Sequence, residues 1–85
     1  MIGIRKVKGN SMTPTLKEGN FLIIQTLFFK PKIGDIVTAK TDQGEVVKRV
    51  KKIVDNKYYL IGDNKSSSKF LVERKRITGK VIFSV

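Results

Sequence analysis

The chain has 85 residues and a formal net charge of +11, and it contains neither histidine nor cysteine. Its length allows one small domain over residues 1–85, because two halves would each fall below the size that folds unaided. Missing cysteine and histidine exclude disulfides, thiol nucleophiles and the commonest metal ligands and general base, so we expect no metal or other cofactor, and any catalysis must use other groups.

Short β-rich runs dominate the chain, and the stretches between them carry turn residues. The polar segment SMTPTLKEG contains a proline, which indicates a loop or a single helical turn, and FKPKIGD and TDQG are typical of turns. The segment DNKSSSKF is predicted to be a polar loop. Six strands are expected, at residues 4–9, 20–25, 36–40, 45–53, 57–62 and 77–85.

The spacing of these strands predicts the fold class. Strands that recur every 8 to 12 residues or so, with turn signals between them, favour an all-β barrel or sandwich. The longest apolar run, FLII, is far shorter than the roughly 18 residues that a membrane-spanning helix needs. No signal peptide or membrane anchor is visible in the sequence.

A serine and a lysine form the first candidate site. In the strand EVVKRV, side chains alternate between faces, so Lys48 shares a face with Val46 and Val50. If that face is buried, desolvation lowers the pKa of the lysine and supplies a neutral amine that can act as a general base for Ser11. The alternative is that Lys48 extends from a half-exposed strand to reach water.

Three motifs occur in a fixed order: GNSMTPTLKEGN at 9–20, VVKRV at 46–50 and GDNKSSS at 62–68. Together they resemble the type I signal peptidases and the LexA-like serine peptidases, which use a Ser-Lys dyad. KIGDIV at 32–37 and ITGKV at 77–81 are similar to further strands of that superfamily, so the resemblance covers nearly the whole chain. It implies a small LexA-like or signal-peptidase-like β-barrel or sandwich.

The resemblance also implies roles for individual residues. Ser11 would attack the scissile carbonyl, and Lys48 would take its proton and return it to the leaving amine. The main-chain N–H of Ser11 would stabilise the oxyanion. Gly9 stands where some relatives have a serine hydroxyl as a second donor, so the side-chain donor is missing and a weaker or backbone-only oxyanion hole is expected. Asn10 and Met12 are expected to support the nucleophile, with Met12 packed under the substrate cleft.

The GDN box has two compatible interpretations. Gly62 could supply a positive φ and Asp63 a side-chain cap, which together make an ordinary turn. By resemblance, Asp63 would also pair with Arg49, the neighbour of the general base on the opposite face. Such a pair would fix the strand that carries Lys48 without touching the substrate.

The serines after this box are candidates for orienting the lysine amine. Ser68 stands six residues after Gly62, where signal peptidases have a serine that hydrogen-bonds the lysine. Ser66 and Ser67 are adjacent, and a shift in the loop could give either of them this role. The usual DSR that follows is replaced here by KF, so the local geometry is expected to differ.

Features found in larger members of the superfamily do not occur in this sequence. It has no transmembrane helix, no inserted second β-domain, no DNA-binding domain and no self-cleavage segment. In this it resembles small peptidases that remove leaders from nickel-type superoxide dismutase precursors. We expect a cytoplasmic protein if the chain is complete, and a membrane-associated one if an N-terminal anchor has been removed.

We therefore expect a serine endopeptidase whose partner is a protein or peptide precursor, from which it removes a leader or signal peptide. The alternative is a non-catalytic basic domain that contacts nucleic acid or an anionic membrane, since 18 basic residues face 7 acidic ones. The basic residues are scattered and carry no nucleic-acid-binding signature, so nucleic acid is the less expected partner. A peripheral membrane contact stays open, and the sequence does not indicate an oligomeric state.

Overall fold

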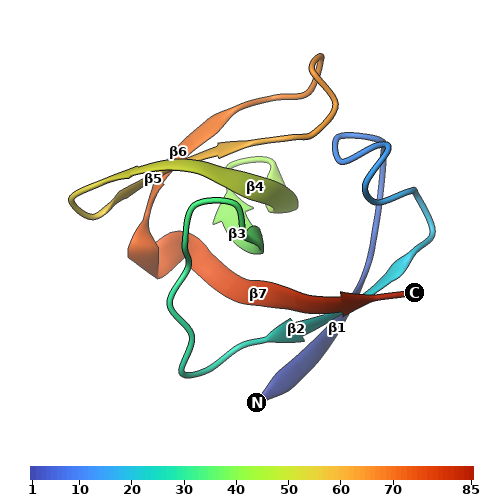
Figure 1. Ribbon diagram of the computed structural model, residues 1–85, viewed down its shortest axis with the longest axis horizontal. Helices are drawn as coiled ribbons and strands as arrows, with labels where there is room; N and C mark the ends of the chain where they lie inside the picture. Colours follow the sequence, from blue (N-terminus) through green and yellow to red (C-terminus); the bar gives the residue numbers. More distant parts are fainter.

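One antiparallel sheet of seven strands runs through the computed structural model, which describes residues 1–85 (Figure 1). The strands are β1 (Ile2–Lys6), β2 (Phe21–Gln25), β3 (Ile36–Thr41), β4 (Gly44–Val54), β5 (Lys57–Ile61), β6 (Phe70–Glu73) and β7 (Ile77–Ser84). A short 3-10 turn, η1 (Arg74–Arg76), connects β6 to β7. The all-β prediction is confirmed. No helix in the structure has the length and apolarity to cross a membrane.

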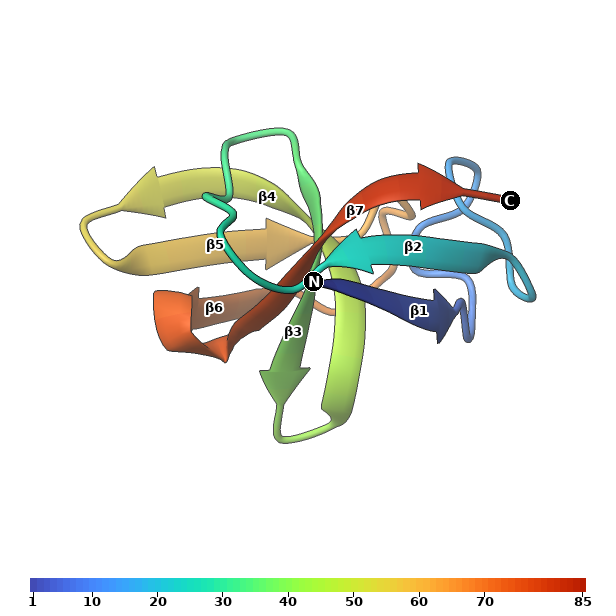
Figure 2. The ribbon, with the colours of Figure 1, turned by 90° about the horizontal axis from the view of Figure 1, so that it is seen from below.

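The strand order in the sheet is β1-β2-β7-β3-β4-β5-β6, so β1 and β6 are its two edges and the sheet is not closed. The strands of the β3 to β6 segment pair with their neighbours in sequence, as in a meander. Only β7 connects this segment to the β1-β2 pair within the sheet. Figures 1 and 2 show the sheet curling, with β1 and β2 on one side of β3 and with β5 and β6 on the other.

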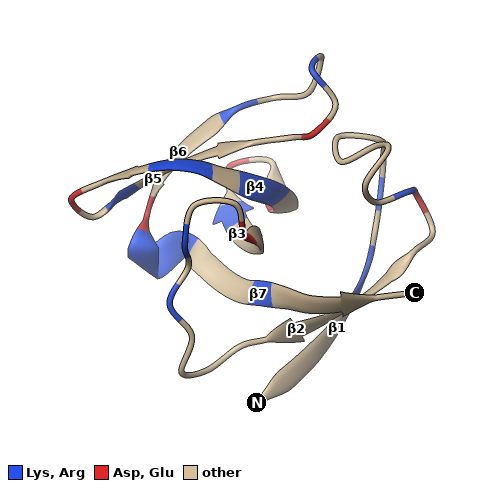
Figure 3. Ribbon diagram, in the orientation of Figure 1, with Lys and Arg blue, Asp and Glu red and all other residues tan.

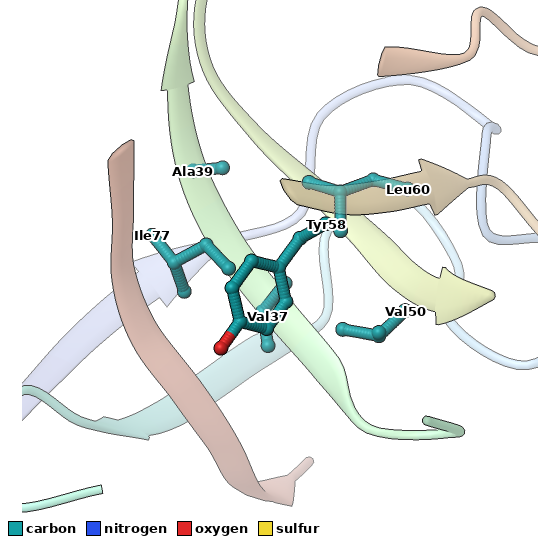
Figure 4. Packing of buried hydrophobic residues seen from close by; sticks show 6 residues of the cluster. All are labelled: Val37, Ala39, Val50, Tyr58, Leu60 and Ile77. Carbon is teal, nitrogen blue, oxygen red and sulfur yellow. The ribbon is translucent and has the colours of Figure 1, made fainter. Parts of the chain in front are cut away.

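Two hydrophobic clusters form the core, one on each side of the curled sheet. Cluster 1 lies within the meander and β7 and consists of Val37, Ala39, Val50, Tyr58, Leu60 and Ile77. Figure 4 shows these six side chains converging around the Tyr58 ring. Cluster 2 joins β2 to the segment after β1 and consists of Val7, Met12, Leu16, Leu22 and Ile24. Met12 and Leu16 lie in the loop that carries Ser11, so burial of this loop holds it against the sheet.

The strand β4 passes between the two clusters. Val50 belongs to cluster 1 and Val46 packs against it, whereas Val47 packs against cluster 2, as alternation along a strand requires. Lys48 lies on the same face of the strand as Val46 and Val50, and it is only 4% exposed. The predicted face is therefore buried, and the half-exposed alternative for Lys48 is wrong.

Two details differ from the expectations. The strand β6 was not expected, and it pairs with β5 from Leu60↔Phe70 to Lys57↔Glu73. The first strand was expected at residues 4–9, but β1 ends at Lys6, before Gly9 takes a positive φ of 75°.

Candidate active site

Ser11 and Lys48 line the same surface groove, although 36 residues separate them in the sequence. The groove has a volume of about 460 Å³, and its two walls are residues 4–8 and residues 45–48. Met12 also lines it while remaining 1% exposed. The structure therefore brings the expected nucleophile, the expected base and the expected packing residue to one place.

Both walls of the groove are strand segments with an unpaired edge. β1 pairs only with β2. The first half of β4 pairs with β3 on one side, and its pairing with β5 on the other side begins only at Arg49. Residues 45–48 therefore keep one row of backbone groups free. Unpaired strand edges are where an extended peptide can add as a further strand.

An ion pair crosses the groove from one wall to the other. Arg5 Nε donates to Glu45 Oε1 at 2.6 Å, and Thr78 Oγ1 donates to Glu45 Oε2 at 3.0 Å. Sequence reasoning missed this contact, because nothing in the spacing of Arg5 and Glu45 indicates that β1 and β4 face each other.

Burial lowers the pKa of Lys48. Desolvation lowers the pKa of its amine from the ordinary value of 10.5, because the apolar surroundings disfavour the charged form. Lys48 Nζ lies over the ring of Phe70, 5.8 Å from its centroid. Phe70 is the F of the KF that replaces the usual DSR, and sequence reasoning assigned it no role. This environment favours a neutral amine of the kind that a general base requires.

The loop that carries Ser11 is braced by Asn64. The Asn64 backbone N–H donates to the Ser11 carbonyl oxygen at 2.9 Å, and its side-chain amide donates to the Asn10 carbonyl oxygen at 3.1 Å. Asn10 therefore supports the nucleophile through its backbone. Sequence reasoning gave Asn64 no role of its own. The only indication of this role in the sequence was that Asn64 belongs to the GDN motif.

The pair between Arg49 and Asp63 is present and ties three segments together. Arg49 donates to both carboxylate oxygens of Asp63, at 2.8 and 2.7 Å, and also to the Gly34 carbonyl oxygen at 2.7 Å. Thr15, from the loop of the nucleophile, donates to the same carboxylate. The hydrogen bonds from Arg49, with a smaller contribution from Thr15, lower the pKa of Asp63, and the bond to Asp63 raises the pKa of Arg49.

The turn interpretation of the GDN box is wrong in two respects. Gly62 does not take a positive φ. Glycine is required there for space, because a Cβ would lie 2.1 Å from Ser67 Oγ and 2.3 Å from the Ser11 carbonyl oxygen. Asp63 does not cap the turn either, since its carboxylate is taken by Arg49 and Thr15.

Gly9 does take a positive φ, of 75°. An L-residue such as serine is strained in this conformation. Glycine adopts this backbone conformation without that strain.

The three candidate serines have separate contacts. Ser66 donates from both its backbone N–H and its hydroxyl to Asn64 Oδ1, Ser67 packs against Gly62, and Ser68 is exposed. None of them is hydrogen-bonded to Lys48 in the structure. Ser11 Oγ and Lys48 Nζ are not hydrogen-bonded to each other either, although both line the groove. Catalytic hydrogen bonds in apo structures are often long or poorly aligned and tighten only when substrate binds.

Comparison with protein families gives one result that covers the whole site. The model of the family described as Peptidase S24-like matches residues 2–82, which include both walls of the groove, the loop that carries Ser11 and the loop of Asn64 that braces it. A comparison with curated proteins gives no match.

Proposed function

The chain belongs to the peptidase S24-like family, and from this premise we propose that it is a serine endopeptidase with a Ser11–Lys48 dyad. The observation that supports the proposal is that Ser11 and Lys48 line one groove, and that Lys48 is buried with a lowered pKa. No histidine or cysteine exists to take either role. A Ser-Lys pair is a known variant of the triad, with the lysine in the place of histidine.

In the first half of the reaction, neutral Lys48 removes the proton from Ser11 Oγ as this oxygen attacks the scissile carbonyl. The negative charge that develops on the carbonyl oxygen is stabilised by the Ser11 backbone N–H. The Lys48 ammonium then gives its proton to the leaving amine, and the C–N bond breaks. This leaves the acyl group esterified to Ser11.

In the second half, Lys48 takes a proton from a water molecule that attacks the ester. The proton returns to Ser11 Oγ as the acid product leaves, so both residues regain their starting state. The burial of Lys48 serves both halves, because desolvation lowers the pKa of its amine and so favours the neutral form that accepts a proton.

The substrate that fits this groove is an extended peptide segment. Such a segment can pair with the free edges of β1 and of residues 45–48 while its carbonyl reaches Ser11. We propose that this segment belongs to a protein precursor whose leader or signal peptide is removed. Loops and termini of precursors are extended and accessible, which the groove requires.

A peptide library derived from a cellular proteome, read by mass spectrometry, tests the proposal. Wild-type protein should generate new peptide ends, and Ser11→Ala and Lys48→Met should each reduce this cleavage about 10³-fold or more. Lys52→Met, at an exposed position of the same strand, is the matched control and should retain cleavage. Cleavage that survives both Ser11→Ala and Lys48→Met would refute the dyad.

A second candidate function is a non-catalytic basic domain that contacts an anionic membrane or nucleic acid. The observation that favours it is that Ser11 and Lys48 are not hydrogen-bonded, in a chain with a net charge of +11. Binding to anionic vesicles or to oligonucleotides that weakens steeply with salt and is unchanged by Ser11→Ala, in a protein without cleavage activity, would support it. A flat salt response would count against it.

A further inference from the structure

A second pocket lies outside the groove, over the outer face of β5. It has a volume of about 370 Å³ and is lined by Lys51, Lys65 and Lys69 together with Tyr59 and Ser67. None of the residues that line it is acidic. We call it the lysine pocket. The proposed peptidase chemistry uses none of these lysines.

Local backbone structure places Lys51 at this pocket. The register of β4 against β5 shifts between Val50 and Lys52, which marks a β-bulge. A bulge lets two consecutive residues stand on one face, so Lys51 and Lys52 are both exposed while Ile53 returns to the core. Lys51 follows buried Val50 and so stands on the side of Tyr59, and the bulge adds Lys52 to the same side.

Hydrogen bonds within the loop between β5 and β6 place the other two lysines. Asn64 Oδ1 accepts from Ser66, and the Ser67 N–H donates to the Asn64 carbonyl oxygen at 3.0 Å. These bonds give residues 64–67 a defined turn, with Lys65 inside it and Lys69 just beyond. Figure 3 shows basic residues on this loop and on β4.

The positive charge of the pocket is uncompensated. None of its three lysines forms an ion pair, and the nearby Asp63 is occupied by Arg49 and Thr15. Another pocket of similar size has Lys40, Lys57 and Arg76 in its lining, but it also contains Asp42 and Glu73. Like charges that converge without a counter-charge favour the binding of an anion.

We propose that the lysine pocket binds a compact phosphate group that carries two or more negative charges. Such a group can contact three ammonium groups at once, whereas the phosphodiesters of an extended nucleic acid each carry one charge. The hydroxyls of Ser67 and Tyr59, which also line the pocket, can donate hydrogen bonds to phosphate oxygens.

Titration with inorganic pyrophosphate at low ionic strength, followed by NMR, tests this site. Saturable shifts should appear at the amides of Lys65, Ser67 and Lys69. The triple variant with Lys51→Gln, Lys65→Gln and Lys69→Gln should bind at least about tenfold more weakly, which corresponds to about 1.4 kcal/mol. All three lysines are exposed, so the variant is expected to fold.

The matched control removes the same number of positive charges from the other pocket, which contains both basic and acidic residues. Lys40→Gln, Lys57→Gln and Arg76→Gln together should alter pyrophosphate affinity by no more than about twofold. Equal weakening in both triple variants would mean that only net charge matters, and it would overturn the proposal. The absence of saturable shifts at millimolar pyrophosphate would also overturn it.

Two further probes distinguish the sources of the phosphate. Vesicles with phosphatidic acid present a phosphomonoester, and vesicles with phosphatidylglycerol present a phosphodiester of lower charge. Pocket-dependent binding to the first alone would assign a lipid headgroup, and pocket-dependent binding to pyrophosphate alone would assign a soluble phosphate. The oligonucleotide provides the opposing test. If a single-stranded oligonucleotide binds at the lysine pocket more tightly than pyrophosphate and phosphatidic acid vesicles do, the proposal of a compact phosphate ligand is refuted. These readouts do not depend on cleavage, so the site and the peptidase proposal can fail separately.

Discussion

Lys48 shows how strand alternation alone can place a charged group in a core. Its neighbours two residues away on each side, Val46 and Val50, pack in cluster 1, and the strand leaves Lys48 no other direction. This part of the site was predictable because a period of two residues is visible in sequence. The contact with Phe70 was not, because it depends on where β6 begins.

Replacing Lys48 with methionine, which is similar in length and uncharged, should raise the free energy of unfolding at neutral pH. Burial lowers the pKa of Lys48 in the folded protein, so below that folded pKa the native state bears the full cost of a buried charge. As pH rises from the folded pKa to 10.5, the unfolded chain binds more protons than the folded one, and wild-type stability increases.

Urea unfolding of both proteins across this pH range measures the effect. The advantage of Lys48→Met should be largest below the folded pKa and should shrink as pH approaches 10.5. Lys52→Met is the control, since Lys52 is exposed. An advantage of the same size at every pH would contradict the titration of a buried amine.

A second prediction at this scale concerns Gly62. Gly62→Ala should lower the free energy of unfolding by about 1–3 kcal/mol, because the added Cβ has no space beside Ser67 and the backbone of Ser11. It should also shift the NMR signal of the Ser11 amide and reduce cleavage. Gly19→Ala is the control: it strains a backbone with a φ of 93°, but its Cβ meets nothing within 4 Å. A Ser11 signal that moves equally in both variants would argue against this packing role.

At the scale of elements, prediction from sequence succeeded where turns and alternation were clear. The strands around residues 21–25, 36–41, 44–54 and 57–61 were expected nearly in place. The strand β6 was missed because its four residues follow a polar loop and show no clean alternation. Its pairing with β5 and the packing of Phe70 and Val72 on cluster 1 are tertiary effects, and these outweigh a weak local pattern.

Asp63 tests the connection between elements. Asp63→Asn should lower the free energy of unfolding at neutral pH by about 1.5–3 kcal/mol, because hydrogen bonds from Arg49 to a charged acceptor are lost. Arg49 lowers the pKa of Asp63, so this stability is present above the unfolded value of 3.8 and is lost as pH falls through the lower folded pKa.

Unfolding at pH 7 and near pH 2 checks this prediction. The difference between wild type and Asp63→Asn should be large at pH 7 and should shrink at the acidic end. Asp42→Asn, at an exposed turn position without an ion pair, should cost little at either pH. Equal losses for the two variants would show that the Arg49 contact adds no stability.

For the whole molecule, net charge should limit stability. The chain has 18 basic and 7 acidic residues and forms four ion pairs, so most of its positive charge is uncompensated. Sodium chloride screens this repulsion, and raising it from 10 to 300 mM should increase the melting temperature by about 2–5 °C. The triple glutamine variant of the lysine pocket, with three fewer positive charges, should respond less. A melting temperature that falls with salt would contradict the prediction.

The position of β7 in the sheet has a consequence for how the protein is made. The strands that precede it in the chain form two groups, and within the sheet only β7 pairs with both. While the ribosome is still translating residues 77–84, the β1-β2 pair that leads into the Ser11 loop and the strand with Lys48 lack the strand that joins them. The groove shared by Ser11 and Lys48, and with it the proposed dyad, is therefore expected to be complete only after this segment has left the exit tunnel.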